Sequence, residues 1–142
     1  HESDLPEGRG FAPIQWQILK NKNKIVFSLI EAVERVDSGS IIQKSNLIFK
    51  GHELNDEIRK MQALSTINII KSFLKKYPKF KKNRQLGKSS YFKRRNERDS
   101  KLNINKSIKS NFNLLRVVDN DKYPAFFEYK KKKYIIKIFK EN

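Results

Sequence analysis

Two histidines and one carboxylate are the side chains of this chain whose types best suit proton transfer. His1 is the first residue, His52 follows a glycine, and Asp37 begins an Asp-Ser-Gly sequence. An imidazole titrates near neutral pH, and a carboxylate can move a proton itself or orient an imidazole. Residue type alone favours plainer roles: a solvated residue or tag remnant for His1, a surface or capping residue for His52, and a turn former for Asp37.

The amino-acid composition excludes several other kinds of functional site. The chain has no cysteine, which excludes disulfides, thiolate metal sites and a cysteine nucleophile, and which fits a reducing, cytoplasmic location. The histidines are not spaced as metal ligands and there is no glycine-rich phosphate loop, so we expect no metal cofactor. No apolar run approaches the roughly 20 residues of a membrane span, so we expect no membrane insertion.

Charge is distributed unevenly along the 142 residues. The formal net charge is +17, and residues 71–142 carry all of this excess, with 23 basic and six acidic side chains. Such an excess predicts a polyanionic partner: nucleic acid, a nucleotide or an anionic membrane surface. A compositionally biased genome would also produce a chain rich in Lys, Asn and Ile.

The front half must position the candidate residues, and its pattern is α/β. A loop over residues 1–10 precedes a short helix over 13–20 and strands over 25–30 and 41–49. The apolar run of the first strand predicts a strand covered on both faces. A long helix is predicted over 53–76, ended by a proline and with one apolar face formed by Leu54, Ile58, Met61, Leu64, Ile67, Ile70 and Leu74.

The back half has the pattern of a small α+β subdomain. Residues 79–105 are basic and aperiodic and are predicted to form a long connecting loop. A helix over 107–117, with Ile108, Phe112 and Leu115 inward, precedes a terminal hairpin of strands 126–129 and 134–139. We therefore divide the chain into 1–78, 79–105 and 106–142. Two strands and one long helix make an incomplete sheet, so we expect earlier strands to be missing from the front part.

The order of these pieces resembles a known family. The first sixteen residues, HESDLPEGRGFAPIQW, are similar to the active-site loop of the folate-dependent formyltransferases, which reads Asn-x-His, Ser-x-Leu-Pro, a glycine and a proline before a short helix. That family includes methionyl-tRNA formyltransferase and the enzymes that formylate nucleotide-linked amino sugars. Residues 29–41, LIEAVERVDSGSI, resemble its second signature, a strand ending in Asp-x-Gly. The family's C-terminal segment is similar to Arg94-Arg95, Asp99, Ile104, Asn113-Leu114-Leu115-Arg116 and Tyr123-Pro124-Ala125-Phe126-Phe127.

The resemblance implies a fold and a reaction. The expected fold is α/β: the C-terminal part of a Rossmann-like formyltransferase domain, followed by the small α+β subdomain with its terminal β-hairpin. The cosubstrate would be 10-formyltetrahydrofolate, whose formyl carbon an amine attacks, with no metal required. Carried over, His1 is the catalytic histidine and Asp37 its carboxylate, while Val36, Asp37 and Ser38 contact the folate. His1 would stabilise the growing oxyanion and help move the amine's proton.

The family's first half is not in this chain, and its catalytic asparagine would lie two positions before His1. We therefore expect the chain to be a fragment that is inactive as it stands. The 64 residues after Pro78 are fewer than the tRNA enzymes' β-barrel domain needs, which favours a nucleotide-linked amino sugar used for surface polysaccharide (lipopolysaccharide) or glycan synthesis. The positive charge favours the alternative, methionyl-tRNA. A non-catalytic basic RNA-binding module is a third hypothesis, and the oligomeric state, a homodimer included, stays open.

The predicted substrate residues are Tyr91, Arg94 and Arg95. An arginine can bind a diphosphate in a bidentate manner, and Tyr91 with Phe92 can stack on a base. In the alternative interpretation the aromatic residues pack the subdomain and the arginines pair with Glu97 and Asp99.

Overall fold

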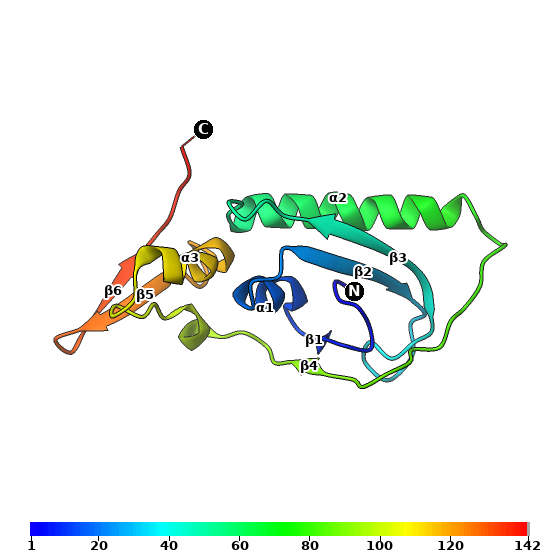
Figure 1. The fold of residues 1–142 in the computed structure, drawn as a ribbon, viewed down its shortest axis with the longest axis horizontal. Helices are drawn as coiled ribbons and strands as arrows, with labels where there is room; N and C mark the ends of the chain where they lie inside the picture. Colours follow the sequence, from blue (N-terminus) through cyan, green and yellow to red (C-terminus); the bar gives the residue numbers. More distant parts are fainter. Residues whose placement is uncertain (142) are drawn as a thin grey trace.

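The computed structural model describes residues 1–141, which mix helices and short sheets as an α/β chain should (Figure 1). Its strands form three separate two-stranded sheets, so the Rossmann-like sheet stays a prediction. The elements in chain order are β1 (Arg9–Gly10), α1 (Pro13–Leu19), β2 (Lys24–Ile30), β3 (Ile41–Ile48), α2 (Asn55–Leu74), β4 (Tyr91–Phe92), the 3₁₀ turn η1 (Glu97–Ser100), α3 (Ile108–Val117), β5 (Ala125–Tyr129) and β6 (Lys132–Ile136).

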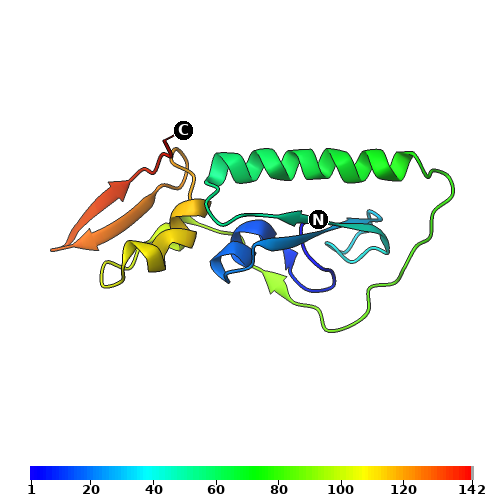
Figure 2. The ribbon, with the colours of Figure 1, turned by 45° about the horizontal axis from the view of Figure 1, so that its top comes forward.

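The front of the chain is built on the antiparallel pair β2–β3. Ile25 lies opposite Leu47 and Phe27 opposite Ser45, and α2 runs along this pair (Figure 2). The prediction that β2 is covered on both faces is only partly confirmed: Ile25, Phe27 and Ser28 are buried, whereas Val26, Leu29 and Ile30 are half-buried. The main core joins this sheet to three helices and contains Ile14, Ile18, Ile25, Phe27, Leu47, Phe49, Ile58, Ile69 and Val117.

Helix α2 confirms the predicted long helix but not its predicted apolar face. The side chain of Glu57 accepts from the backbone N–H of Leu54 at 2.9 Å and so caps the first turn. Ile58 and Ile69 are buried, because eleven residues are close to three full turns and place both on the sheet side. The other side of the helix holds four exposed residues of the predicted face, Leu64, Ile67, Ile70 and Leu74. No helix of residues 1–141 is both long and apolar enough to cross a membrane.

Residues 79–105 are more ordered than the predicted loop. Asn83 pairs with Ile41 at the start of β3, and β4 then pairs in parallel with β1. The short turn η1 follows, capped by Asn96. Figure 1 shows this segment passing around the front part and back beneath β1. Its pairing with β1 and β3 holds it against the loops that carry the candidate site.

The back of the chain consists of α3 and the antiparallel pair β5–β6. The side chain of Ser107 accepts from the N–H of Ser110 and caps α3. Leu115 packs inward as predicted, but Ile108 is 78% exposed, because it lies at the first position of the helix, beyond the packed surface. The strand β6 ends three residues before the predicted end, and the two-residue turn at Lys130 and Lys131 has the positive φ angles of a tight hairpin.

Candidate active site

The structure brings His1 and Asp37 together. Nδ1 of His1 lies 3.4 Å from Oδ2 of Asp37, and the two side chains are only 10% and 18% exposed. Nε2 of His1 lies 2.8 Å from the carbonyl oxygen of Gly8. A carbonyl can only accept, so Nε2 carries a proton here, while Nδ1 faces a second acceptor. A doubly protonated imidazole beside an ionised Asp37 satisfies both contacts.

Backbone contacts fix each member of this pair. The backbone nitrogen of His1 donates to the Ser28 carbonyl at 2.9 Å, and the N–H of Ser28 donates back to His1 at 2.8 Å, so His1 lies beside β2. The N–H of Gly10 donates to Oδ2 of Asp37 at 2.8 Å. Asp37 is therefore tied to the loop that follows His1.

The loop around Asp37 depends on a close backbone approach. A Cβ at Gly39 would overlap the carbonyl oxygen of Glu31, so glycine is the residue that fits. Gln85 donates to the carbonyls of Asp37 and Gly39, both at 2.8 Å, and accepts from the guanidinium of Arg9. The connecting segment after α2 thus supports the Asp37 loop, a role that its composition did not indicate.

The predicted folate residues beside Asp37 differ in their surroundings. Val36 is 61% exposed. The hydroxyl of Ser38 donates to the carbonyl of Arg35 at 2.7 Å, and its N–H points to the same oxygen at 3.3 Å. Ser38 therefore closes the turn that presents Asp37.

The predicted substrate residues do not form one cluster. The hydroxyl of Tyr91 accepts from Arg9 and Arg35, each at 3.2 Å, and these bonds lower the pKa of Tyr91. The guanidinium of Arg94 lies over the ring of Phe11, 4.6 Å from its centroid. Arg95 is half-buried and donates to the carbonyls of Val117 and Asp99, and burial lowers its pKa.

The alternative interpretation of this loop is wrong about the arginines and about where the aromatic residues pack. Phe92 does pack, but on Trp16 of α1 in the front of the chain, with ring centroids 6.5 Å apart, and Tyr91 is 55% exposed. The arginines do not pair with the carboxylates of Glu97 and Asp99. Those carboxylates bind Lys133 and Lys93 instead, because the carboxylate of Asp99 turns toward Lys93 and leaves its carbonyl to Arg95.

A hollow of about 500 Å³ opens beside His1. Its walls come from the loop after His1, the start of α2, η1 and the segment after α3, so the front and back of the chain both contribute. Arg95 is the predicted substrate residue that lines it. Residues 1–141 contain no group of three or more His, Asp or Glu side chains placed to hold a metal ion. The arrangement can hold a substrate and move a proton at His1.

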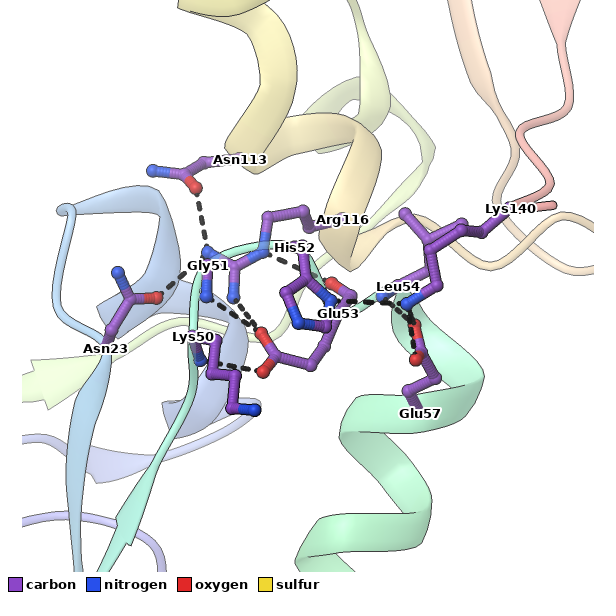
Figure 3. A network of polar contacts seen from close by, with 10 residues as sticks. All are labelled: Asn23, Lys50, Gly51, His52, Glu53, Leu54, Glu57, Asn113, Arg116 and Lys140. Atoms are coloured by element: carbon purple, nitrogen blue, oxygen red, sulfur yellow. Dashed lines mark hydrogen bonds and ion pairs between the residues drawn. The ribbon is translucent and has the colours of Figure 1, made fainter. Parts of the chain in front are cut away.

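A buried ion pair lies behind this hollow and joins α3 to the segment before α2, near the lining residues Asn55 and Val117. Arg116 is 1% exposed and Glu53 4%, and Nη2 of Arg116 lies 3.2 Å from Oε2 of Glu53 (Figure 3). Nη1 of Arg116 donates to the side chains of Asn23 and Asn113, at 2.9 and 3.0 Å. Burial raises the pKa of Glu53, but hydrogen bonds from backbone N–H groups, including that of Lys50, outweigh this and lower it overall.

Comparison with known proteins identifies relatives of the chain, although no family model matches it. It is 26% identical over 132 residues to the bifunctional polymyxin resistance protein ArnA of Wigglesworthia glossinidia brevipalpis, covering 91% of this chain and 20% of ArnA. It is 29% identical over 175 residues to methionyl-tRNA formyltransferase of Prochlorococcus marinus, covering 96% of this chain and 50% of that protein. The chain thus spans half or less of the length of these relatives.

Solved structures share the fold. Methionyl-tRNA formyltransferase from Clostridium thermocellum matches with a TM-score of 0.81 and 24% identity, over 100% of this chain and 62% of its own. The N-formyltransferase from Helicobacter canadensis, solved with folinic acid and dTDP-3-aminofucose, matches with a TM-score of 0.70 and 20% identity, over 91% of this chain and 49% of its own. The chain is related to the formyltransferases. The predicted resemblance is thereby confirmed.

Glu53 and Gln85 are two residues near the site that sequence reasoning missed. Glu53 lies at the predicted start of the long helix, where a carboxylate is explained by its favourable interaction with the helix dipole. A buried ion pair was therefore not suspected there. Gln85 lies in the segment predicted as a loop. Arg116 lies in the segment that resembles the family's C-terminal motif, but no role was assigned to it. Its apolar neighbours in the sequence could have indicated that it is buried.

Proposed function

We propose that the protein transfers a formyl group from 10-formyltetrahydrofolate to the amine of a nucleotide-linked amino sugar. The observation that carries this proposal is the pair of His1 and Asp37, whose histidine lines a hollow. The relatives and structural neighbours support it, because they are formyltransferases and one was solved with folinic acid and a nucleotide-linked amino sugar.

The reaction sets clear tasks for the side chains. The amine nitrogen attacks the formyl carbon, the bond from that carbon to the folate nitrogen breaks, the amine loses a proton and the folate nitrogen gains one. His1 can donate its Nε2 proton to the formyl oxygen as negative charge grows there, or relay a proton from the amine. This requires Nε2–H to leave the Gly8 carbonyl for the substrate.

Asp37 has a positioning part in this proposal. Its carboxylate faces Nδ1 of His1 and so orients the ring and stabilises its protonated form. We place Val36 and Ser38 at the folate because they flank Asp37, and Tyr91, Arg94 and Arg95 at the acceptor. The division into 1–78, 79–105 and 106–142 belongs to the same proposal, with the hollow formed between the first and the later parts.

A second candidate function is the formylation of methionyl-tRNA. It is favoured by the net charge of +17 and by the relatives from Prochlorococcus marinus and Clostridium thermocellum. The experiment that separates the two supplies the full-length protein and 10-formyltetrahydrofolate with a panel of nucleotide-linked amino sugars and, in parallel, with methionyl-tRNA. Mass spectrometry then detects the acceptor that gains one formyl group. Formylation of the tRNA alone would replace the first proposal by the second.

A further inference from the structure

Charged side chains from distant parts of the chain meet around the hollow beside His1. The cations are Arg59 on α2, Arg95 before η1 and Lys122 after α3, and the carboxylates are Glu2 and Asp119. The hollow therefore carries one positive charge in excess before the imidazole is counted. An anionic group entering it meets a favourable field.

Arg59 is tethered at this hollow but keeps most of its hydrogen-bonding capacity. Its Nη1 lies 3.4 Å from Oδ2 of Asp119, and its side chain is 60% exposed. A guanidinium has five N–H donors in a planar fork that matches phosphate oxygens. One long contact with Asp119 leaves the remaining donors for a ligand.

The same carboxylate orders the turn that carries Lys122, which also lines the hollow. Oδ1 of Asp119 accepts from the backbone N–H groups of Asp121 and Lys122, both at 3.0 Å, and the Asp119 carbonyl accepts from the N–H of Tyr123. These contacts form the turn that brings Lys122 to the hollow. Within residues 1–141, no carboxylate lies at ion-pairing distance from the Lys122 ammonium. Asp119 thus contacts Arg59 through one carboxylate oxygen and orders the turn of Lys122 through the other.

The other two arginines near the hollow are placed differently: Arg95 is half-buried, and Arg94 is not among the residues that line the hollow. Arg95 donates to the carbonyls of Val117 and Asp99, and Arg94 lies over the ring of Phe11. A phosphate group that enters the hollow therefore meets two exposed cationic side chains of its lining, Arg59 and Lys122.

We propose that Arg59 and Lys122 bind the diphosphate of the nucleotide-linked acceptor at this hollow, while the sugar amine reaches His1. This inference rests on the proposed function and adds to it a phosphate subsite on α2 and on the turn after α3. Both side chains are exposed, so the subsite can be removed without disturbing the core.

The test measures binding of UDP and dTDP to the full-length protein by titration calorimetry. Arg59→Gln and Lys122→Gln should each weaken binding about tenfold, the effect of losing one charge-assisted hydrogen bond. The double variant should bind more weakly than either. Lys60→Gln and Lys106→Gln are matched controls, because they remove exposed cations outside the hollow, and both should bind as the parent protein does.

Formyl transfer measured on the same preparations separates this inference from the proposed function. If the double variant formylates an amino-sugar nucleotide with an unchanged KM, the subsite is wrong and the function stands. If the diphosphates bind and need both cations, but no acceptor is formylated, the subsite stands and the function is wrong. Parent protein that binds neither diphosphate would overturn the subsite.

Discussion

The guanidinium of Arg116 and the carboxylate of Glu53 form a buried ion pair across the boundary between the front and back of the chain. Arg116 lies in α3, whereas Glu53 lies just before α2, and Nε of Arg116 also donates to the Glu53 carbonyl at 3.2 Å. The residue after Arg116, Val117, accepts from Arg95 and lines the hollow beside His1. This pair therefore sets how the later part of the chain faces His1.

Removing the positive charge of Arg116 should destabilise the fold strongly. Arg116→Met leaves the Glu53 carboxylate buried without its partner, and we expect the free energy of unfolding to fall by about 3–5 kcal/mol. Urea unfolding followed by circular dichroism measures this loss. Arg98→Met is the control, because Arg98 is an exposed arginine, and it should change stability by less than about 0.5 kcal/mol.

A second substitution shows whether charge or packing is responsible. In Arg116→Met with Glu53→Leu, no buried charge is left alone, so much of the stability should return. Equal losses in the single and double variants would contradict the assignment of the effect to the unpaired carboxylate.

Gly39→Ala should disturb the Asp37 loop through steric overlap alone. The added Cβ would overlap the carbonyl oxygen of Glu31, and a rigid backbone atom cannot move aside as a flexible side chain can. We expect a loss of about 1–3 kcal/mol in unfolding free energy, together with lower formyl transfer. At Gly87, which has a positive φ but open space around it, the same change should cost about 1–2 kcal/mol from backbone strain and leave transfer intact. Parent-like transfer by Gly39→Ala would count against the close approach.

Acid should weaken the turn that carries Lys122. Hydrogen bonds from backbone N–H groups, first that of Lys122, lower the pKa of Asp119 in the folded chain. A carboxyl with a lowered folded pKa contributes stability that is complete above its unfolded pKa of about 3.9 and is lost as the pH falls through the folded pKa. Urea unfolding between pH 6 and pH 3, at intervals of about half a unit, should show a shallower decline for Asp119→Asn than for the parent chain. Identical declines would show that Asp119 does not contribute.

The sequence predicted the elements with strong local signals. The helices at α1, α2 and α3 and the strands β2 and β3 follow from apolar spacing, caps and breakers, and their ends agree within a few residues. The pairing of β4 with β1 was missed, because a strand of two residues has no period to detect. The exposed side of α2 was misjudged because Leu64 and Ile67 have the spacing of a core face without a packing partner in the described chain.

The candidate site also contains residues that the sequence predicted and residues that it did not. His1 and Asp37 were found through motifs, and the structure places them at ion-pair distance. Arg59 and Lys122 carried no signal, since single cations in a Lys-rich chain look alike until the fold brings them to one hollow.

The most direct test of formyl transfer by the His1–Asp37 pair is the turnover of the full-length protein with 10-formyltetrahydrofolate and its acceptor. His1→Ala should lower kcat at least about 100-fold, because a group that moves a proton in the transition state is lost. Asp37→Asn should also lower it, while His52→Ala, which alters the exposed histidine, should leave it unchanged. Unfolding curves of each variant confirm that the fold is retained. Turnover near the parent value in His1→Ala would contradict the central claim.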